Sequence, residues 1–327
     1  MNKKQKLVEL LETNDDGYLS GNVIAEALGI TRAAVWKYIK QLQEEGYEIE
    51  AVTNRGYRLG ARNDVISEFL INKYLGAYAD RFALEVRAEV TSTNDVLKED
   101  ASDLPPWKTL VAMQQTAGKG RRGRSFYSPA DTGFYLSILL KMDIGPEIAT
   151  RFTTAAAVAA CRAIEICTDA RPAIKWVNDV FVDKHKVCGI LTEASISVES
   201  GGLDWAVMGI GFNVYEPAGG FPGEIADVAG AISKTREKNL RSRIAAEFMR
   251  SFYDLCQDIS GNNMASEYKR RSFMIGRDIL VLRGDKQVEA VAVDIDDECR
   301  LIVRYADGRE EALSSGEVST KVSGKHA

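Results

Sequence analysis

Two largely apolar runs separated by a glycine-rich basic segment restrict the fold of this chain more than any other feature. The runs TLVAMQQ (residues 109–115) and FYLSILL (residues 134–140) are typical of buried β-strands. Between them, AGKGRRGRSF (residues 117–126) places three glycines and four cationic side chains within ten residues. This order predicts two strands of one sheet joined by a mobile cationic loop.

The glycine spacing of this loop matches two phosphate-binding signatures only in part. Gly118, Gly120 and Gly123 have the G-x-G-x-x-G spacing of dinucleotide-binding loops, but that motif must lead directly into a helix. Here the loop-forming run SPADTG (residues 128–133) follows instead. A Walker A loop is also excluded, because Arg124 stands where that motif needs Lys before Ser or Thr. What remains is a loop whose N–H groups and arginines suit a phosphate or carboxylate, or else a solvated basic loop or nucleic-acid patch.

Composition is that of an ordinary globular protein with room for two or three domains. The chain has 327 residues, of which 45% are hydrophobic and 27% charged. Its net charge of −5 means that any DNA contact must come from local clusters rather than the overall field. Five cysteines without a C-x-x-C pair, no apolar run long enough to span a membrane and a polar N-terminus predict a cytoplasmic protein.

Histidine is scarce, with only two in the whole chain. A Ser-His-Asp triad, a Cys-His pair or a histidine-based metal site therefore has almost nothing to be built from. Any catalysis is expected to rest on lysine, arginine and carboxylate side chains.

The first sixty residues predict a winged helix-turn-helix. In LSGNVIAEALGITRAAVWKYIKQLQEEGY (residues 19–47), Ser20 and Thr31 suit helix N-caps and Gly29 suits the turn between the helices. The run YEIEAVTNRGYRL (residues 47–59) then alternates as two short strands around a turn, as a wing does. Six residues on the second helix and the wing are expected to contact DNA: Thr31, Arg32, Lys37, Lys40, Arg55 and Arg58.

The charge of this segment leaves an alternative open. Residues 1–62 carry nine basic and nine acidic side chains, which also fits a packing or dimerisation domain without DNA contact. Most of the acids fall outside residues 31–40 of the second helix and outside the wing, which favours DNA binding.

A second group of candidate residues lies in the middle of the chain. The run RFTTAAAVAACRAIEICTD (residues 151–169) predicts a long buried helix, and AIKWVNDVFVDKHKVCGILTEAS (residues 173–195) predicts strand, turn and strand. A further strand, WAVMGIGFNVY (residues 205–215), contains glycines against which a ligand could lie. Taken singly, these positions also fit a solvated lysine, a hairpin turn, a strand-edge lysine and a bulge. The candidate contact residues here are Lys175, Asn178, Asp179, Lys186, Gly209 and Gly211.

Five motifs together are more specific than any one of them. They are TSTND (residues 91–95), QTAGKGRRGR (115–124), KWVND (175–179), KVCGIL (186–191) and GIGFNV (209–214). In this order and approximate spacing the chain resembles the biotin protein ligases, in particular the bifunctional kind that also represses biotin synthesis genes. The resemblance covers essentially the full length. Three positions depart from the residues common in that family: Lys119 replaces arginine, Phe126 tryptophan and Val177 proline.

The resemblance implies an α/β (α+β) fold with three domains. A winged helix-turn-helix DNA-binding domain would span residues 1–62. A mixed-sheet, class II synthetase-like catalytic domain that binds biotin and ATP would span residues 63–270. Residues 271–327 would form a small SH3-like β-barrel, in agreement with their short alternating runs and Gly-Asp, Asp-Asp and Asp-Gly turns. The implied activity joins biotin to ATP with Mg²⁺, forming biotinyl-5′-AMP, and then transfers biotin to an acceptor lysine.

Roles for individual residues also follow from the resemblance. Lys186 is expected to bridge the biotin carboxylate and the α-phosphate, with Arg121 and Lys175 as further catalytic cations. Asp179 would either orient a lysine or help to hold Mg²⁺. The expected biotin contacts are Ser92, Thr93, Asn94, Gln115, Gly118, Lys119, Gly120, Arg121, Lys186, Gly209 and Gly211. The expected ATP or adenylate contacts are Arg122, Arg124, Phe126, Lys175, Asn178 and Asn213.

The implied partners are a biotin carboxyl carrier protein of acetyl-CoA carboxylase or a related carboxylase, operator DNA, and a second copy of the chain in a ligand-promoted homodimer, with no membrane. Two alternatives remain. One is a transcription regulator that binds a small molecule without turning it over, against which the lysines beside the cationic loop argue. The other is a lipoate ligase with a related core, against which the glycine-arginine loop and the winged helix argue.

Overall fold

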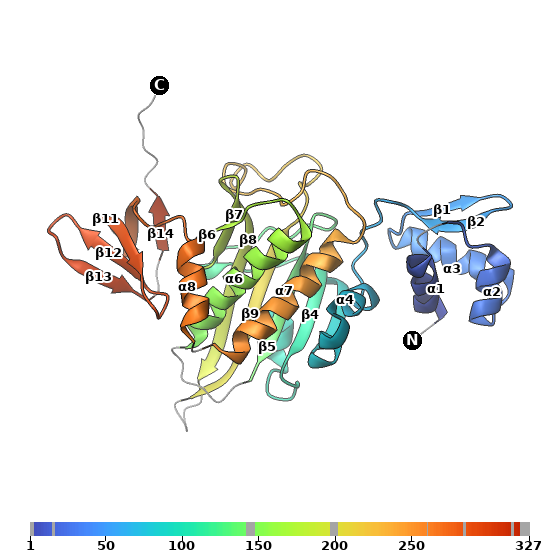
Figure 1. Cartoon of the computed structure of the whole chain (residues 1–327), viewed down its shortest axis with the longest axis horizontal. Coiled ribbons are helices and arrows are strands. Elements are labelled where there is room, and N and C mark those ends of the chain that lie inside the picture. Colours follow the sequence, from blue (N-terminus) through green and yellow to red (C-terminus); the bar gives the residue numbers. More distant parts are fainter. Residues whose placement is uncertain are drawn as a thin grey trace. The chain divides into compact units, whose positions relative to one another are not determined.

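The structure divides the chain into two compact units. The computed structural model describes residues 3–14, 17–141, 148–196, 202–259, 261–283, 286–314 and 317–320. Unit 1 consists of Met1–Gly76 with Thr235–Ala246, and unit 2 of Ala77–Lys234 with Glu247–Ala327 (Figure 1). The winged-helix region thus shares its unit with two short segments of the region predicted to be catalytic. The predicted domain boundaries at residues 62 and 270 stay predictions.

Unit 1 begins as a winged helix-turn-helix. Its elements are α1 (Lys3–Thr13), α2 (Gly21–Leu28), α3 (Arg32–Glu44), β1 (Ile49–Val52), β2 (Gly56–Leu59) and α4 (Glu68–Leu75). The predicted caps are confirmed: Val23 N–H donates to Ser20 Oγ at 3.2 Å, and Ala34 N–H donates to Thr31 Oγ1 at 3.2 Å. Gly29 has a left-handed φ of 60° and ends α2.

The apolar face of α3 forms part of the core of unit 1. Val35, Ile39 and Leu42 are buried there with residues of α1 and α2, as their helical spacing predicts. Strands β1 and β2 pair antiparallel, with Ile49 opposite Leu59, and thus form the predicted wing. Because α3 packs through one face, its basic residues are left in solvent.

A buried ion pair ties the later segment of unit 1 to the earlier one. Helix α7 (Leu240–Gln257) begins in unit 1, and the Arg241 guanidinium lies with its Nε 3.0 Å from Asp64 Oδ2. Arg241 also donates from its backbone N–H to Asp64 Oδ1 at 3.0 Å and from its guanidinium to the Asp64 carbonyl. Asn239 adds a hydrogen bond to the buried Glu12 carboxylate at 2.9 Å.

Unit 2 is built on a seven-stranded mixed sheet of order β3-β4-β5-β9-β8-β7-β6. Only the β3–β4 pair is parallel among the ladders of this sheet that the structure describes. The strands are β3 (Ala83–Val90), β4 (Lys108–Gln115), β5 (Gly133–Leu140), β6 (Ala173–Lys175), β7 (Asp179–Val182), β8 (His185–Ile196) and β9 (Leu203–Asn213). The two predicted strands that flank the basic loop are confirmed as β4 and β5, paired antiparallel.

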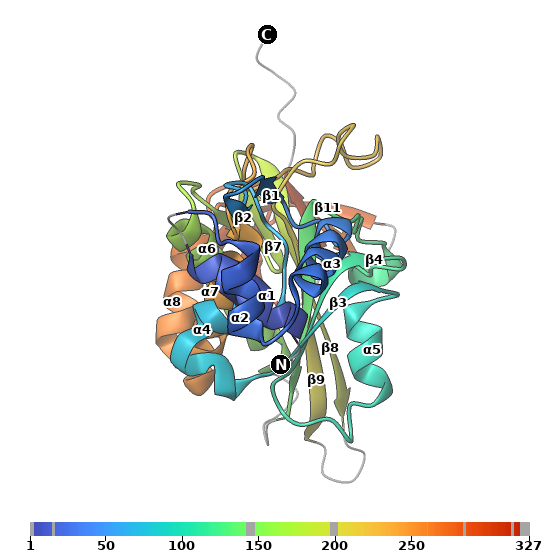
Figure 2. The same ribbon diagram turned by 90° about the vertical axis from the view of Figure 1, so that its right-hand side faces the viewer.

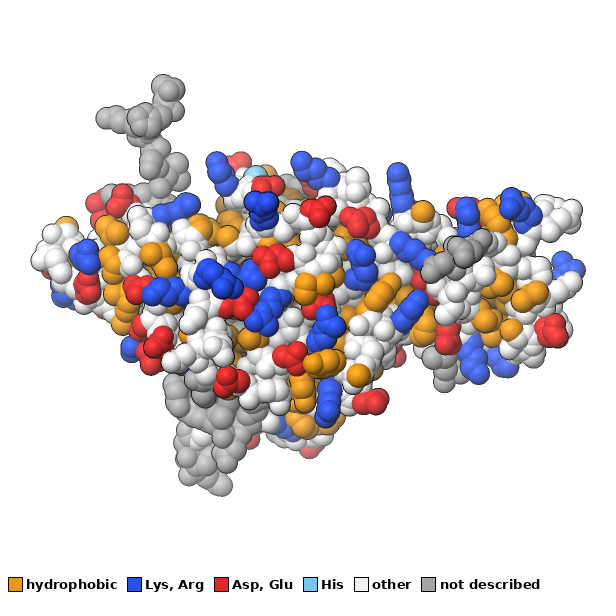
Figure 3. All heavy atoms as spheres, viewed as in Figure 1, with side chains coloured by type: hydrophobic (Ala, Val, Ile, Leu, Met, Phe, Trp, Pro, Cys, Tyr) orange, Lys and Arg blue, Asp and Glu red, His pale blue; other side chains and the backbone are white. Residues whose placement is uncertain are grey.

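Helices cover both faces of this sheet. Figure 2 shows α6 (Ile148–Cys167) on one face and α5 (Thr93–Glu99) on the other. Helix α8 (Asn262–Arg271) packs on α6, and a short 3-10 helix, η1 (Gly76–Arg81), precedes β3. On the face that Figure 3 shows, basic and acidic side chains are interspersed, as the small net charge suggests. None of the helices in the described ranges is both long and apolar enough to cross a membrane.

The segment predicted as strand, turn and strand contains three strands. Residues 176–178 form one turn, so that Lys175 on β6 pairs with Asp179 on β7. A second turn at Asp183 and Lys184 leads to β8; both residues have positive φ, 47° and 72°, as in tight two-residue hairpins. The prediction of a single turn was wrong because this second turn lacks the Asn-Gly or Asp-Gly pair that usually marks one.

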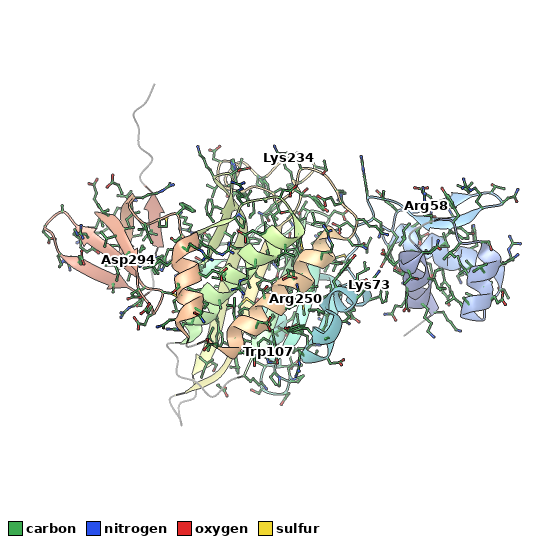
Figure 4. All side chains as sticks on the ribbon, viewed as in Figure 1. Arg58, Lys73, Trp107, Lys234, Arg250 and Asp294 are labelled. Carbon is green, nitrogen blue, oxygen red and sulfur yellow. The ribbon has the colours of Figure 1, made fainter. Side chains whose placement is uncertain are left out.

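A five-stranded antiparallel sheet near the C-terminus completes unit 2, as the alternating pattern predicts. Its order is β13-β12-β11-β10-β14. The strands are β10 (Asp278–Arg283), β11 (Lys286–Ile295), β12 (Leu301–Tyr305), β13 (Glu310–Leu313) and β14 (Glu317–Thr320). Trp176 Nε1–H donates to the Cys299 carbonyl at 2.9 Å. Elsewhere in unit 2, Trp107 (Figure 4) packs with its ring centroid 4.8 Å from that of Tyr253.

Candidate active site and DNA-binding surface

The basic loop between β4 and β5 closes on itself as a small hairpin. Gly120 N–H donates to the Arg124 carbonyl at 2.7 Å, and Phe126 N–H donates to the Gly118 carbonyl at 2.9 Å. Its tip is a short turn, η2 (Arg121–Gly123), in which Arg122 has a positive φ of 56°. A Cβ on Gly118 would lie 2.5 Å from the Phe126 carbonyl oxygen, so glycine is required there for close backbone packing.

A small pocket beside this loop gathers most of the predicted biotin-binding residues. Its polar rim comes from the start of α5, the end of β4 and the loop, and its apolar part from Ile190, Leu191 and Ile210. The predicted residues that line it are Ser92, Thr93, Asn94, Gln115, Lys119, Gly120, Arg121, Lys186, Gly209 and Gly211. Gly118 lies behind the lining, within the closed loop. An apolar pocket with a few convergent polar groups suits a small, partly polar ligand.

Two glycines of β9 leave room that other side chains occupy. A Cβ on Gly209 would lie 2.0 Å from Asn94 Oδ1, and a Cβ on Gly211 would lie 2.4 Å from the Phe126 ring. Contacts this short are impossible, so both positions require glycine while Asn94 and Phe126 keep their places. The glycines therefore serve the neighbouring side chains as well as the pocket.

The polar side of the pocket is a connected set of hydrogen bonds. Thr93 N–H donates to Gln115 Oε1 at 2.8 Å, and Asn94 Nδ2 donates to Glu193 Oε2 at 2.7 Å. Asn94 Oδ1 lies 2.6 Å from the hydroxyl oxygen of Ser137, which is fully buried in β5. Sequence reasoning missed Ser137 and Glu193; the one available signal was a serine within the apolar run FYLSILL.

Lys186 and Arg121 lie where this pocket meets a second, larger one. Lys186 Nζ is 2.7 Å from Asp179 Oδ1 and 5.9 Å from the centre of the Phe126 ring. Arg121 donates to Asn178 Oδ1 at 3.2 Å. Both cations line both pockets, so a ligand group at their boundary would meet two positive charges.

The larger pocket, about 500 Å³, contains most of the residues predicted to contact ATP. These are Arg124, Phe126, Lys175, Asn178 and Asn213, with Asp179 beside them. Arg122 is exposed and does not line either pocket. The C-terminal sheet contributes Leu282 and Val318 to the same lining.

Carboxylates and thiols near the site have altered pKa values. Burial raises the pKa of Asp95, but hydrogen bonds from Lys119 and Lys98 outweigh it and lower the pKa below its usual value. Burial raises the pKa of the Cys188 thiol well above its ordinary range. A thiol held in its protonated form is a poor nucleophile, so Cys188 is not a candidate for a reacting group.

Three of the six predicted DNA-binding residues line a groove between α3 and the wing in unit 1. Arg32, Lys40 and Arg55 line it, together with Trp36, whose side chain is 57% exposed and which sequence reasoning missed. Thr31 is the α3 N-cap, and Lys37 is exposed on α3 outside the groove lining.

Arg58 does not line the groove, and its partners are Glu50 on β1 and Tyr18, which precedes α2. On β2 (Figure 4), it pairs with Glu50 at 2.7 Å, and its guanidinium lies 4.8 Å from the centre of the Tyr18 ring. Arg55 lies 4.9 Å from the same ring. Aromatic stacking orders both guanidinium groups at the surface, where they could meet phosphates.

Three family models match the chain in succession. Residues 3–58 match an HTH domain, residues 86–213 the biotin/lipoate A/B protein ligase family, and residues 274–321 the biotin protein ligase C terminal domain. These matches agree with the predicted order of DNA-binding, ligase and C-terminal parts.

Two relatives match over nearly the whole chain. The bifunctional ligase/repressor BirA of Bacillus subtilis is 31% identical over 317 residues, which cover 95% of this chain and 97% of that protein. The bifunctional ligase/repressor BirA of Escherichia coli is 25% identical over 320 residues, 97% and 96% of the two chains. The biotin protein ligase from Aquifex aeolicus in complex with biotin and ATP has the same fold, with a TM-score of 0.59 at 24% identity over 73% of this chain and 98% of that one. This chain belongs to the family of bifunctional biotin ligase/repressors.

Proposed function

We propose that this ligase joins biotin to the α-phosphate of ATP and passes the biotinyl group to one lysine of a biotin carboxyl carrier protein. The observation that carries this proposal is the meeting of the two pockets at Lys186 and Arg121. The small pocket suits the ring of biotin, and the large one has the cations that a nucleotide needs. We place the activity in the cytoplasm, since the five cysteines of the chain are scattered without a C-x-x-C pair, as suits a protein of a reducing compartment.

Lys186 and Arg121 would stabilise charge in the first step. A biotin carboxylate oxygen attacks the α-phosphorus, a bond forms between them, and the bond to the leaving pyrophosphate breaks. The two cations face the boundary where carboxylate and phosphate meet, and preorganised charges there lower the barrier. In the second step the acceptor lysine amine attacks the biotinyl carbonyl carbon, loses a proton and displaces AMP.

Mg²⁺ would neutralise the polyphosphate of ATP when it is bound. In the described part of the chain no group of three His, Cys, Asp or Glu side chains is placed to hold a metal ion. Among the described residues that line the larger pocket, Asp179 is the one with a carboxylate. A site with one carboxylate suits Mg²⁺ that is held mainly by phosphate oxygens and water.

Mass spectrometry of the purified protein after incubation with biotin, ATP and Mg²⁺ tests the activity. Bound biotinyl-5′-AMP, with one pyrophosphate released for each adenylate formed, is the expected result. Lipoate in place of biotin should give no adenylate. Biotin binding without pyrophosphate release would instead indicate a non-catalytic regulator, and a lipoyl adenylate would indicate a lipoate ligase.

Gly209→Ala is expected to weaken biotin binding by about ten- to a hundredfold. The added Cβ would lie 2.0 Å from Asn94 Oδ1 and displace that side chain. Loss of buried hydrogen bonds costs about 1–3 kcal/mol, which corresponds to this range. Calorimetric titration with biotin measures the effect. Gly17→Ala is the matched control, because a Cβ on Gly17 meets nothing within 4 Å.

Arg121→Gly is expected to let the intermediate escape. The Arg121 side chain lines both pockets from the loop tip, so its loss opens the site to water while Lys186 remains. The variant should still form biotinyl-5′-AMP but biotinylate bystander proteins such as serum albumin. Arg122→Gly removes the same charge from the exposed neighbouring position and should release less biotinyl-5′-AMP than Arg121→Gly does. Equal retention of labelled adenylate by wild type and Arg121→Gly would rule out a role for Arg121 in retention.

We further propose that biotinyl-5′-AMP promotes a homodimer that binds operator DNA. A single winged helix has a small footprint, and specific binding commonly pairs two half-sites. Ordering of the basic loop over the ligand would lower the cost of ordering a dimer surface. Sedimentation and operator titration, each with and without adenylate, should show tighter dimerisation and tighter DNA binding with it, and unbiotinylated carrier protein should oppose both. Equal values in both conditions would remove this switch and leave the ligase unaffected.

A further inference from the structure

A continuous chain of short contacts runs behind the polar wall of the small pocket. Lys98 Nζ lies 2.6 Å from Glu193 Oε1, and Asn94 Nδ2 lies 2.7 Å from Glu193 Oε2. Asn94 Oδ1 lies 2.6 Å from Ser137 Oγ, which in turn lies 2.7 Å from Thr93 Oγ1. Asn94 and Thr93 line the pocket, whereas Ser137 and Glu193 do not.

Glu193 determines which way the Asn94 amide points. A carboxylate that pairs with an ammonium can only accept hydrogen bonds, so Asn94 must turn its NH₂ group toward it. The second amide hydrogen is directed to the Leu191 carbonyl, 3.2 Å away, which also only accepts. Asn94 Oδ1 therefore faces Ser137, over the space that the missing side chain of Gly209 leaves open.

Ser137 in turn determines where the Thr93 hydroxyl donates its proton. The Ser137 hydroxyl has one proton, and because Asn94 Oδ1 cannot donate, that proton must lie between them. Two hydroxyl oxygens 2.7 Å apart also need a proton between them, and the one that remains belongs to Thr93. The Thr93 hydroxyl thus donates to Ser137, and the lone pairs of Thr93 Oγ1 are left as acceptors.

The Thr93 proton could otherwise turn toward Gln115, whose Oε1 lies 3.1 Å from Thr93 Oγ1. That choice would leave no proton between the Ser137 and Thr93 hydroxyl oxygens, which are only 2.7 Å apart. Their lone pairs would then repel each other more strongly than those of Thr93 and Gln115 at 3.1 Å. The Gln115 amide is itself oriented. Its Nε2 donates to Ser128 Oγ at 3.0 Å, because the Ser128 hydroxyl donates to the Phe126 carbonyl at 2.8 Å.

We propose that Ser137 and Glu193 are positioning residues that make this wall of the pocket accept hydrogen bonds rather than donate them. Asn94 Oδ1, Thr93 Oγ1 and Gln115 Oε1 then all present lone pairs. Such a wall selects a ring with N–H donors, as in a cyclic urea, and repels a ring that places an oxygen in the same position. This inference rests on the proposed function, because biotin has a cyclic urea.

Two cyclic carbamate analogues of biotin, each with one ureido N–H replaced by oxygen, test the inference by calorimetric titration. The wild-type protein should bind biotin at least about tenfold more tightly than one of them. In Ser137→Ala the Thr93 hydroxyl is released and can turn to donate to the ring oxygen. Affinity for biotin should then fall, and affinity for that carbamate should stay the same or rise. The ratio of the biotin affinity to the carbamate affinity should therefore decrease at least about tenfold.

The ratio of the two affinities distinguishes a positioning role of Ser137 from a merely structural one. If Ser137→Ala weakens biotin and carbamate by the same factor, or weakens neither, the inference is overturned. Wild-type protein that binds both ligands equally also overturns it, and leaves the ligase assignment intact. Wild-type protein that binds no biotin contradicts the proposed function instead.

A second variant keeps the test decisive if Ser137→Ala does not fold. Glu193→Gln replaces an acceptor by a side chain that can also donate, so the Asn94 amide can turn over. This variant should also decrease the ratio of the biotin affinity to the carbamate affinity, and an unchanged ratio would overturn the inference. Ser251→Ala, which removes a buried hydroxyl from α7 outside the pocket lining, is the matched control and should leave the ratio unchanged.

Discussion

Lys186→Ala should lower the rate of biotinyl-5′-AMP formation about a thousandfold, a loss of ~4 kcal/mol of transition-state stabilisation. The Lys186 ammonium lines both pockets at their boundary and lies 2.7 Å from Asp179 Oδ1. Negative charge increases at this boundary when the carboxylate attacks the phosphate, so the lost attraction is largest in the transition state. Pyrophosphate release at saturating biotin and ATP measures the rate.

Lys184→Asn is the matched control for this substitution. Lys184 is two residues away, exposed, and has a φ of 72°, a conformation that asparagine tolerates. Its neutralisation should change the rate less than threefold, since it lies in the turn before β8 and outside both pocket linings. A rate for Lys186→Ala within tenfold of wild type would contradict its catalytic role. Biotin binding by the variant shows that the small pocket is still formed.

Arg241→Ala should lower the free energy of unfolding by about 3–5 kcal/mol, because it removes the cation that compensates the buried Asp64 carboxylate. The side chains of Arg241 and Asp64 are 2% and 0% exposed, so solvent barely screens the pair. Urea denaturation followed by circular dichroism measures the change. The pair joins two segments of unit 1 that are far apart in sequence, so DNA binding should be lost with it.

Two further variants separate the ion pair from other effects. Arg243→Ala removes a partly exposed arginine two positions along α7, whose guanidinium is 3.5 Å from Glu237, and should cost less than about 1 kcal/mol. Arg241→Met with Asp64→Asn removes both charges and keeps an acceptor for the Arg241 backbone N–H, so it should be more stable than Arg241→Ala. A double variant as unstable as the single one would mean that the lost guanidinium hydrogen bonds, rather than the uncompensated charge, account for the loss.

The winged helix shows how much local sequence can predict. Ser20, Gly29 and Thr31 act within three or four residues of their own positions, as N-cap, left-handed turn and N-cap. The burial of Val35, Ile39 and Leu42 follows from the period of a single helix. Such features depend on neighbours along the chain, and each was predicted correctly. Trp36 was missed because an exposed apolar residue looks the same in sequence as a buried one.

The middle of the chain shows where local reasoning was insufficient. Asp183 and Lys184 in this turn have positive φ although neither is glycine or asparagine. The hairpin is stabilised instead by the antiparallel pairing of β7 with β8. Propensity alone disfavours that conformation for lysine. Pairing across the sheet overrides it, and so three strands form where two were predicted.

By itself the sequence determined the element types, the winged helix, the strands on either side of the basic loop and the residue types of the site. Only the tertiary structure decided how those residues work together. Asn94 contacts Ser137 43 residues away and Glu193 99 residues away, and Asp64 meets Arg241 across 177 residues. For the Asn94 contacts the physical reason is the strand order β5-β9-β8, which brings Ser137, Gly209 and Leu191 side by side beneath Asn94. Strand order arises from long-range pairing, and no periodicity within one segment encodes it.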